Sequence, residues 1–338
     1  MTTEKENFLM TLRGEIPEWV PRFTYGALPG EKKPVPNQMV EPPFLSEYRM
    51  TGGGKDIWGV EYVGTKEAAG GMLPKPGEFI LKDIKKWRDV IQAPDISNID
   101  WEAMAKKHLE SLQIDRTQTA VTFALHFGYF QHLMAFMGFT EGLCAMHEEP
   151  EEVMALFDYL CDFYCTVAEN IMHYYEPDVF SIADDTAAWL NPFISPEMYR
   201  RMLVPFYDRQ ASIAREAGII IGMHNCGRSE CFIDDWLAIG VSVWDPAQTI
   251  NDLDGIKQKY GNKLVLAGGW DPVGVLASPE VTDQQIYDSV KHAMDRLAPG
   301  GGYVFAGGFL GAIDDPEVKR KNEVLTRAVE EIGRSFYK

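Results

Sequence analysis

The chain has 338 residues, of which 46% are hydrophobic and 24% are charged, as in ordinary globular proteins. Its net charge of −18 repels nucleic acid and anionic membranes, so we expect neither as a partner. No apolar run approaches the roughly 20 residues that span a bilayer. The N-terminus has no apolar secretory segment, and the five cysteines do not suggest a disulfide framework. We therefore expect a cytoplasmic protein.

The first third of the chain has an irregular pattern. Between residues 26 and 77, Gly- and Pro-rich stretches such as "GALPGEKKPVP" and "TGGGKDIWG" carry turn signals throughout. These stretches predict loops around short hairpin strands. We place one early strand at "VPRFTY", near Val20, and another at 58–62.

From about residue 119 onward, short apolar segments alternate with longer amphipathic ones. The apolar segments predict strands at "AVTFAL", "DVFSIA", "GIIIGM", "VSVW", "KLVLAG" and "GYVFAG". The amphipathic segments predict helices at 150–174, 196–217, 229–239, 252–260, 281–297 and 315–334. Ser195 and Pro196 are suited to begin one helix as N-cap and first residue, and Gly218 follows its end.

This alternation implies parallel strands, and the two early strands bring their number to about eight. Eight is the number that closes a (β/α)8 TIM barrel, which is the α/β fold that we predict. An open doubly wound sheet is the alternative, but no Gly-x-Gly-x-x-Gly loop follows an early strand. We expect a single domain over 1–338, with N-terminal loops and first strands in 1–118 and the regular part in 119–338.

Ionisable side chains follow directly after five of the predicted strands. In a barrel, catalytic groups gather at the carboxyl ends of the strands, so these side chains would converge on one mouth. Aspartate is also a common turn and N-cap residue, which is the plain alternative for each of them. The strand-end residues are His126, Asp184, Asp185, His224, Cys226, Asp245 and Asp271. The candidates for catalysis among them are His126, Asp184, Asp185 and Asp271.

His224 and Cys226 form the most specific pair. Side chains two apart on a strand point the same way, so imidazole and thiolate would project together while Asn225 points elsewhere. Both are ligands suited to Zn²⁺, and Gly227 would let the chain turn away from a metal. Most His-x-Cys pairs bind no metal. The metal hypothesis therefore depends on the position of this pair, directly after a predicted strand. Cys161 and Cys165 fit helix packing better.

Several longer stretches resemble the uroporphyrinogen decarboxylase superfamily. They include "FSIADDTA", "FISPEMYRRMLVPFYDRQASIAREAG", "MHNCG" and "IDDWLAIGVSVWDPAQTINDLDGIKQKYGNKLVLAGGWD", together with the opening "KENFLMTLRGEIPEWVP". The resemblance covers nearly the whole chain and implies a (β/α)8 barrel. True decarboxylases of this type hold a polycarboxylate with an arginine-rich N-terminal segment. Here Arg22 is the only arginine near that position, which argues against their activity.

The other branch that the chain resembles contains cobalamin-dependent methyltransferases. There a His-x-Cys pair and a later cysteine bind zinc, and His224 and Cys226 match the first two positions. The third position falls near "YVFAGGFLGA", where this chain has Gly307, Gly308 and Phe309 instead of a cysteine. The candidates to complete the site are Asp184, Asp271 and Cys231.

The resemblance implies a zinc-assisted methyltransferase that works with a corrinoid protein, the carrier of the cobalamin. The small-molecule partner would be a methyl donor, such as a methoxy-arene, or a thiol acceptor. Tyr129, Trp189 and Phe309 would line its pocket, unless they only pack barrel against loops. A homodimer is considered as well, although no sequence feature specifies the oligomeric state. The alternatives are a decarboxylase with Asp184 or Asp185 as acid, and a non-catalytic binding barrel.

Overall fold

The computed structural model describes residues 2–24, 34–64, 71–124, 128–311 and 315–338. The strands are β1 (Asn37–Val40), β2 (Gly53–Lys55), β3 (Glu61–Gly64), β4 (Met72–Pro74), β5 (Ala120–Ala124), β6 (Val179–Ala183), β7 (Ile220–His224), β8 (Val243–Ala247), β9 (Val265–Gly269) and β10 (Tyr303–Ala306). The helices are α1 (Glu4–Leu12), α2 (Pro43–Met50), α3 (Trp87–Val90), α4 (Trp101–Ser111), α5 (Tyr129–Met137), α6 (Phe139–Glu148), α7 (Pro150–Tyr174), α8 (Pro196–Met202), α9 (Val204–Glu216), α10 (Ile233–Ala238), α11 (Leu253–Tyr260), α12 (Asp283–Leu297) and α13 (Pro316–Ser335).

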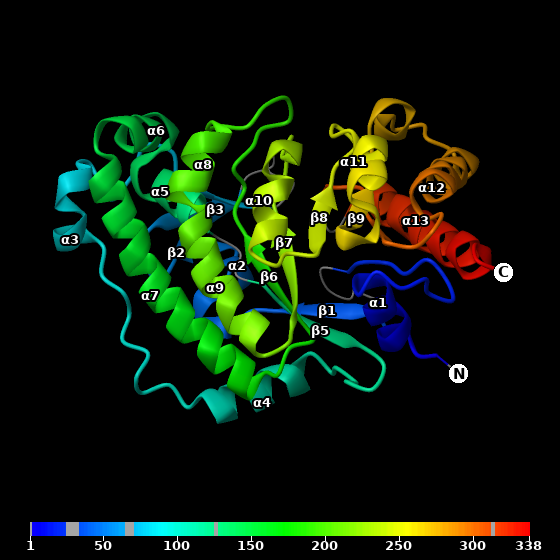
Figure 1. Cartoon of the computed structure of the whole chain (residues 1–338), viewed down its shortest axis with the longest axis horizontal. Helices are drawn as coiled ribbons and strands as arrows, with labels where there is room; N and C mark the ends of the chain where they lie inside the picture. Colours follow the sequence, from blue (N-terminus) through cyan, green and yellow to red (C-terminus); the bar gives the residue numbers. More distant parts are fainter. Residues whose placement is uncertain (1, 25–33, 65–70, 125–127, 312–314) are drawn as a thin grey trace.

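Seven of these strands form a parallel sheet in the order β1-β5-β6-β7-β8-β9-β10. The sheet curls, and helices from α7 (green) to α13 (red) follow one another around its outer face (Figure 1). A short segment of the chain lies at both edges of the sheet. Phe23 donates its backbone N–H to Phe305 of β10 at 2.8 Å. Thr24 donates its backbone N–H to the side chain of Asn37, at the start of β1, at 2.8 Å.

The regular part of the chain agrees with the sequence-based prediction. All six strands predicted after residue 119 are confirmed, and α7 spans the predicted 150–174. Ser195 is confirmed as an N-cap, since its hydroxyl accepts a bond from the backbone N–H of Met198 at 3.2 Å. The helix predicted at 196–217 is divided into α8 and α9, because Pro205 has no N–H to continue the helical bonding.

The early strands were predicted less well. The segment near Val20 contributes one parallel bridge, Arg22 to Phe305, in place of a full strand. The strand expected at 58–62 was wrong as a barrel strand, because it corresponds to β3, which belongs to a separate antiparallel sheet of order β2-β3-β4. The parallel sheet instead contains β1, which is four residues long and lies in the Gly- and Pro-rich region.

Two clusters of buried apolar side chains pack against the parallel sheet. On its concave side the first residues of the strands pack against α1, which covers the amino ends; examples are Ala120, Val179 and Val243, with Phe8 of α1. On the convex side a larger cluster joins the sheet to the surrounding helices. The predicted site residues lie at the opposite, carboxyl ends of these strands. Among the described residues, no helix combines the length and apolar character that crossing a membrane requires.

A chain of buried hydrogen bonds connects the small antiparallel sheet to the start of α5. Trp58 donates its indole N–H to the Tyr164 hydroxyl at 2.9 Å, and Tyr164 lies 2.7 Å from Nε2 of His132. His132 Nδ1 lies 2.7 Å from the carbonyl oxygen of Gly128, which only accepts, so Nδ1 carries the proton and Nε2 accepts from Tyr164. Burial lowers the pKa of His132 to about 4, so the ring is neutral at neutral pH.

Candidate metal centre

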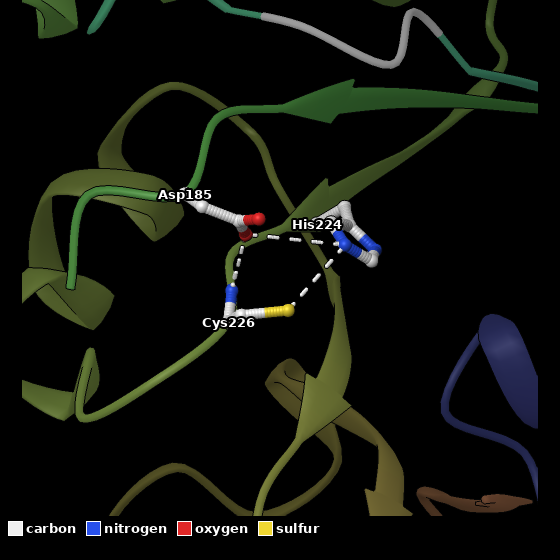
Figure 2. A group of neighbouring side chains, drawn as sticks. All are labelled: Asp185, His224 and Cys226. Atoms are coloured by element: carbon white, nitrogen blue, oxygen red, sulfur yellow. Dashed lines mark hydrogen bonds and ion pairs between the residues drawn. The ribbon is translucent and has the colours of Figure 1, made fainter. Parts of the chain in front are cut away.

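His224 and Cys226 face one another at the carboxyl end of β7. His224 is the last residue of the strand, and its Nε2 atom lies 3.7 Å from the Cys226 sulfur (Figure 2). Between them, Asn225 turns inward, where it is buried and donates its side-chain amide to Thr186 at 2.8 Å. The expectation that the imidazole and thiol project together while Asn225 points elsewhere is therefore confirmed.

Asp185 approaches the same point from the neighbouring strand, β6. Its Oδ1 atom lies 4.0 Å from Nε2 of His224 and accepts the backbone N–H of Cys226 at 2.8 Å (Figure 2). One ligand atom from each of Asp185, His224 and Cys226 lies within 4.8 Å of the others, and no other group of three such residues occurs among the described residues. The side chains of Asp185 and His224 remain partly exposed, at 34% and 25%, so small molecules can reach the group.

The imidazole of His224 is oriented from behind by Asp245 of β8. Nδ1 of His224 lies 2.8 Å from Oδ2 of Asp245, whose side chain is only 3% exposed. This bond orients the ring so that its other nitrogen, Nε2, faces Cys226 and Asp185. Burial acts to lower the pKa of His224, but the carboxylate of Asp245 outweighs it and the pKa lies well above the usual histidine range. Burial raises the pKa of the Cys226 thiol. A metal would therefore bind by displacing protons.

The turn after Cys226 requires glycine. Gly227 has a φ of +83°, and a Cβ atom there would lie 2.5 Å from the carbonyl oxygen of Ala187. Its N–H is donated to Oε1 of Gln248 at 2.6 Å, which fixes the chain as it leaves the site. The interpretation of Gly227 as a residue that lets the chain turn away is consistent with this geometry.

Asp184 points in the opposite direction from Asp185. It is fully buried and accepts hydrogen bonds from the backbone N–H groups of Phe130 and Gln131, both at 2.9 Å, and from the Tyr207 hydroxyl at 2.6 Å. Burial raises its pKa to about 7, and these donors act against that shift. Asp184 therefore fixes the start of α5. Gln131, held there, donates its side-chain amide to Asp185 at 3.3 Å.

The other residues predicted for the site lie in varied surroundings. His126 lies outside the described residues. Asp271 follows β9, and its Oδ2 atom accepts the backbone N–H and the hydroxyl of Thr249, both at 2.7 Å. Tyr129 is 1% exposed and packs against aromatic side chains of α7 and α9, so it is a core residue. Trp189 is 43% exposed. Phe309 packs edge-on against Trp270 at a centroid distance of 5.2 Å.

The third residue of the group with His224 and Cys226 is Asp185, which was not among the candidates for the third ligand. Asp184 faces the core, Cys231 is exposed, and neither belongs to the group of three. Asp271 is absent from the group as well. Asp185, which was predicted as a catalytic residue, is the third residue of this group. Sequence reasoning also missed the orienting role of Asp245 and the contacts of Gln131 and Gln248.

Comparison with known proteins identifies the family. The model of the family described as uroporphyrinogen decarboxylase (URO-D) matches residues 72–324, which is more than half of the chain. The chain therefore belongs to the uroporphyrinogen decarboxylase family, as its sequence motifs indicated. No curated protein matches it at a significant level.

Solved structures share the fold at low sequence identity. A methyltransferase from Methanosarcina mazei is 16% identical, has a TM-score of 0.65, and the match covers 98% of this chain and 99% of that one. A putative vitamin-B12 independent methionine synthase from Listeria monocytogenes is 10% identical with a TM-score of 0.41, and the match covers 68% of this chain and 69% of that one. The first of these likenesses extends over the full length of both chains and supports the α/β fold described above.

Proposed function

We propose that this protein is a zinc-dependent methyltransferase that moves a methyl group between a small molecule and cobalamin carried by a separate corrinoid protein. The observation that carries the proposal is the group formed by Asp185, His224 and Cys226 at the carboxyl ends of β6 and β7. Membership in the uroporphyrinogen decarboxylase family and the full-length likeness to a methyltransferase support it.

The donor atoms of this group fit zinc. A thiolate, an imidazole nitrogen and a carboxylate oxygen are the ligands that Zn²⁺ takes in proteins, and catalytic sites combine three of them with one open position. With bonds of about 2.0–2.3 Å, tetrahedral geometry places ligand atoms roughly 3.3–3.6 Å apart. The observed separations from His224 Nε2, 3.7 Å to Cys226 and 4.0 Å to Asp185, are slightly longer than these values. A small inward movement of the side chains would close the difference.

The later cysteine of the methyltransferase branch has no counterpart here. At Gly308 a Cβ atom would meet only the Asn322 side chain, at 3.5 Å, so the backbone leaves room for a side chain that the chain does not have. In our proposal Asp185 takes the third position. For the fold, we do not favour the open doubly wound sheet. We infer that the segment at Phe23 and Thr24 occupies the position of the eighth strand in a (β/α)8 barrel.

Each residue around the group has a definite task in this proposal. Bound zinc would supply Lewis-acid chemistry, because it stabilises negative charge on the oxygen of a methyl donor or on a thiol acceptor. Asp245 orients the His224 ring so that Nε2 faces Cys226 and Asp185, where a metal would be held. Gln131 orients Asp185, and Asp184 acts only through α5. The alternative in which Asp184 is the acid of a decarboxylase has no support from the site, because Asp184 is fully buried.

Metal analysis of the wild type and of Cys226→Ala tests the proposal. We expect about one zinc per chain in the wild type, since the site has a full set of ligands. Cys226→Ala should lose this zinc, because a thiolate ligand is removed. Cys144→Ala is the matched control, since Cys144 is an exposed cysteine outside the group, and it should keep its zinc.

The functional half of the test is methyl transfer to cob(I)alamin from candidate ethers and thioethers. The wild type should catalyse the transfer and Cys226→Ala should not. A wild-type protein that stays metal-free after growth with added zinc would contradict the proposal. So would a Cys226→Ala variant with unchanged zinc content.

A further inference from the structure

A pair of cysteine thiols lies outside the metal group, where helices α7 and α9 run side by side (Figure 1). Cys161 and Cys165 are one turn apart on α7, and their sulfur atoms are 3.7 Å apart. Cys161 is buried, and Cys165 is partly exposed. The Cys161 sulfur also lies 3.7 Å from the carbonyl oxygen of Phe206 on α9. The proposed methyl transfer uses neither thiol, so the pair is open to another role.

The helix holds these two cysteines too far apart for an unstrained disulfide. Residues four apart on a helix have Cβ atoms about 5–6 Å from each other. A disulfide requires a Cβ separation of about 3.5–4.5 Å. Both cysteines belong to the interior of α7, so closing this difference would distort a continuous helix of 25 residues. We therefore expect both side chains to remain thiols in the folded protein.

The distance between the sulfur atoms instead fits a single atom bound between them. With bonds of about 2.3 Å, two sulfurs at a tetrahedral angle lie about 3.8 Å apart, and two in a linear arrangement lie about 4.6 Å apart. The observed 3.7 Å matches the bent arrangement. Zinc would need further ligands, but among the described residues no third His, Cys, Asp or Glu completes a metal group with this pair. The geometry therefore favours a thiophilic atom that requires only two thiols.

The surroundings of the pair favour reaction with such an atom. The hydrogen bond from the Cys165 thiol lowers the pKa of Cys161, and Tyr129 and Arg209 act in the same direction against burial. Arg209 is held over α7 by ion pairs with Asp158 and Asp162. A thiolate is the form of cysteine that attacks electrophiles, and the partly exposed Cys165 gives a reagent access to the pair.

We propose that Cys161 and Cys165 form a dithiol site that captures one trivalent organoarsenical. In a compound R–As(OH)₂, each As–O bond is replaced by an As–S bond, and each hydroxyl group leaves as water with the proton of one thiol. Arsenic stays trivalent, so the step needs neither oxidant nor reductant. The organic substituent R takes the third position on arsenic and faces the exposed side of Cys165. This site is independent of the proposed methyl transfer.

Titration with phenylarsine oxide, followed by intact mass spectrometry, tests the site. In water this compound is R–As(OH)₂ with a phenyl group as R. The zinc-loaded wild type should gain one adduct per chain, with a mass equal to one phenylarsine oxide less one water. Cys226→Ala should gain the same single adduct, because its dithiol is unchanged. An adduct that disappears in Cys226→Ala would show that the arsenical binds at the metal group, and would overturn the proposal.

Single-cysteine variants locate the adduct. Two thiols in one site bind about 10²–10⁴-fold more tightly than one, so Cys165→Ala should lose affinity by that factor. Cys161→Ala should behave alike. Cys144→Ala is the matched control, since Cys144 is an exposed cysteine of α6, and it should keep the wild-type affinity. Phenylarsine oxide should also raise the Tm of the wild type and leave that of Cys165→Ala unchanged, because only a ligand of the folded dithiol stabilises it.

Oxidation by diamide provides an independent test of the thiol geometry. The folded protein should keep both thiols, which are counted by iodoacetamide labelling after unfolding in urea. The same protein oxidised in urea should form the disulfide, because the unfolded chain has no helix to separate the cysteines. Ready formation of a Cys161–Cys165 disulfide in the folded protein would contradict the geometric argument. A wild type without an adduct, or a Cys165→Ala variant with wild-type affinity, would overturn the dithiol site.

Discussion

His224→Ala is expected to lower the rate of methyl transfer by about a thousandfold. A Lewis acid contributes several kcal/mol to a transition state in which charge develops, and each 1.36 kcal/mol corresponds to about a tenfold change in rate. Losing about 4 kcal/mol of this stabilisation gives the expected factor. The measurement is single-turnover transfer to cob(I)alamin, followed by the absorbance of the corrinoid, with a donor that the wild type accepts.

Asp245→Asn is the control that separates ligation from orientation. It leaves the imidazole in place and removes the carboxylate that lies 2.8 Å from Nδ1. Loss of such an orienting partner typically weakens metal binding 10- to 100-fold. We therefore expect excess zinc to restore much of the rate in Asp245→Asn and none of it in His224→Ala. A His224→Ala rate within threefold of the wild type would show that the metal group takes no part in the reaction.

Asp184→Ala is expected to reduce the free energy of unfolding by about 3–5 kcal/mol. The substitution leaves two backbone N–H groups of α5 and the Tyr207 hydroxyl buried without their acceptor, and each such group costs about 1–3 kcal/mol. Urea unfolding followed by circular dichroism measures the effect. The matched control is Asp185→Ala, which alters the neighbouring but partly exposed aspartate and should cost less than about 1 kcal/mol. Equal losses in the two variants would contradict the role given to Asp184.

The same carboxyl predicts a dependence of stability on pH. Burial raises the pKa of Asp184 to about 7 in the folded protein, above its value of about 3.9 in the unfolded chain. Between these values the folded state binds more protons, so stability falls as the pH rises from about 4 to about 7. Asp184→Asn cannot titrate. The stability of the wild type relative to this variant should therefore decrease over that interval, and a constant or rising difference would contradict the assignment.

The difference between Asp184 and Asp185 could not be read from the sequence. Both follow the same apolar strand, and a one-residue step reverses the direction of a side chain. The decisive information is the alignment of neighbouring strands. Ala183 of β6 pairs with His224 of β7, so the residue two positions on, Asp185, reaches Cys226. His224 in turn pairs with Asp245 of β8. Such registers depend on tertiary structure, which one sequence does not contain.

Local patterns succeeded where they were long and regular. The alternation of apolar strands and amphipathic helices after residue 119 specified six strands, and the His-x-Cys spacing specified a pair that faces one point. They failed for β1, because four residues amid turn signals carry almost no periodicity. Tyr129 was considered for a pocket and lies in the core, since an aromatic residue suits both surroundings.

X-ray absorption at the zinc K-edge of the zinc-loaded wild type tests the metal centre most directly. Cys226 is the one cysteine in the group of three, and the other ligand atoms are nitrogen and oxygen. The expected spectrum contains a single sulfur at about 2.3 Å and nitrogen or oxygen ligands at about 2.0–2.2 Å. Two or more sulfur ligands would show that a different cysteine completes the site. A spectrum without sulfur would show that zinc is bound elsewhere.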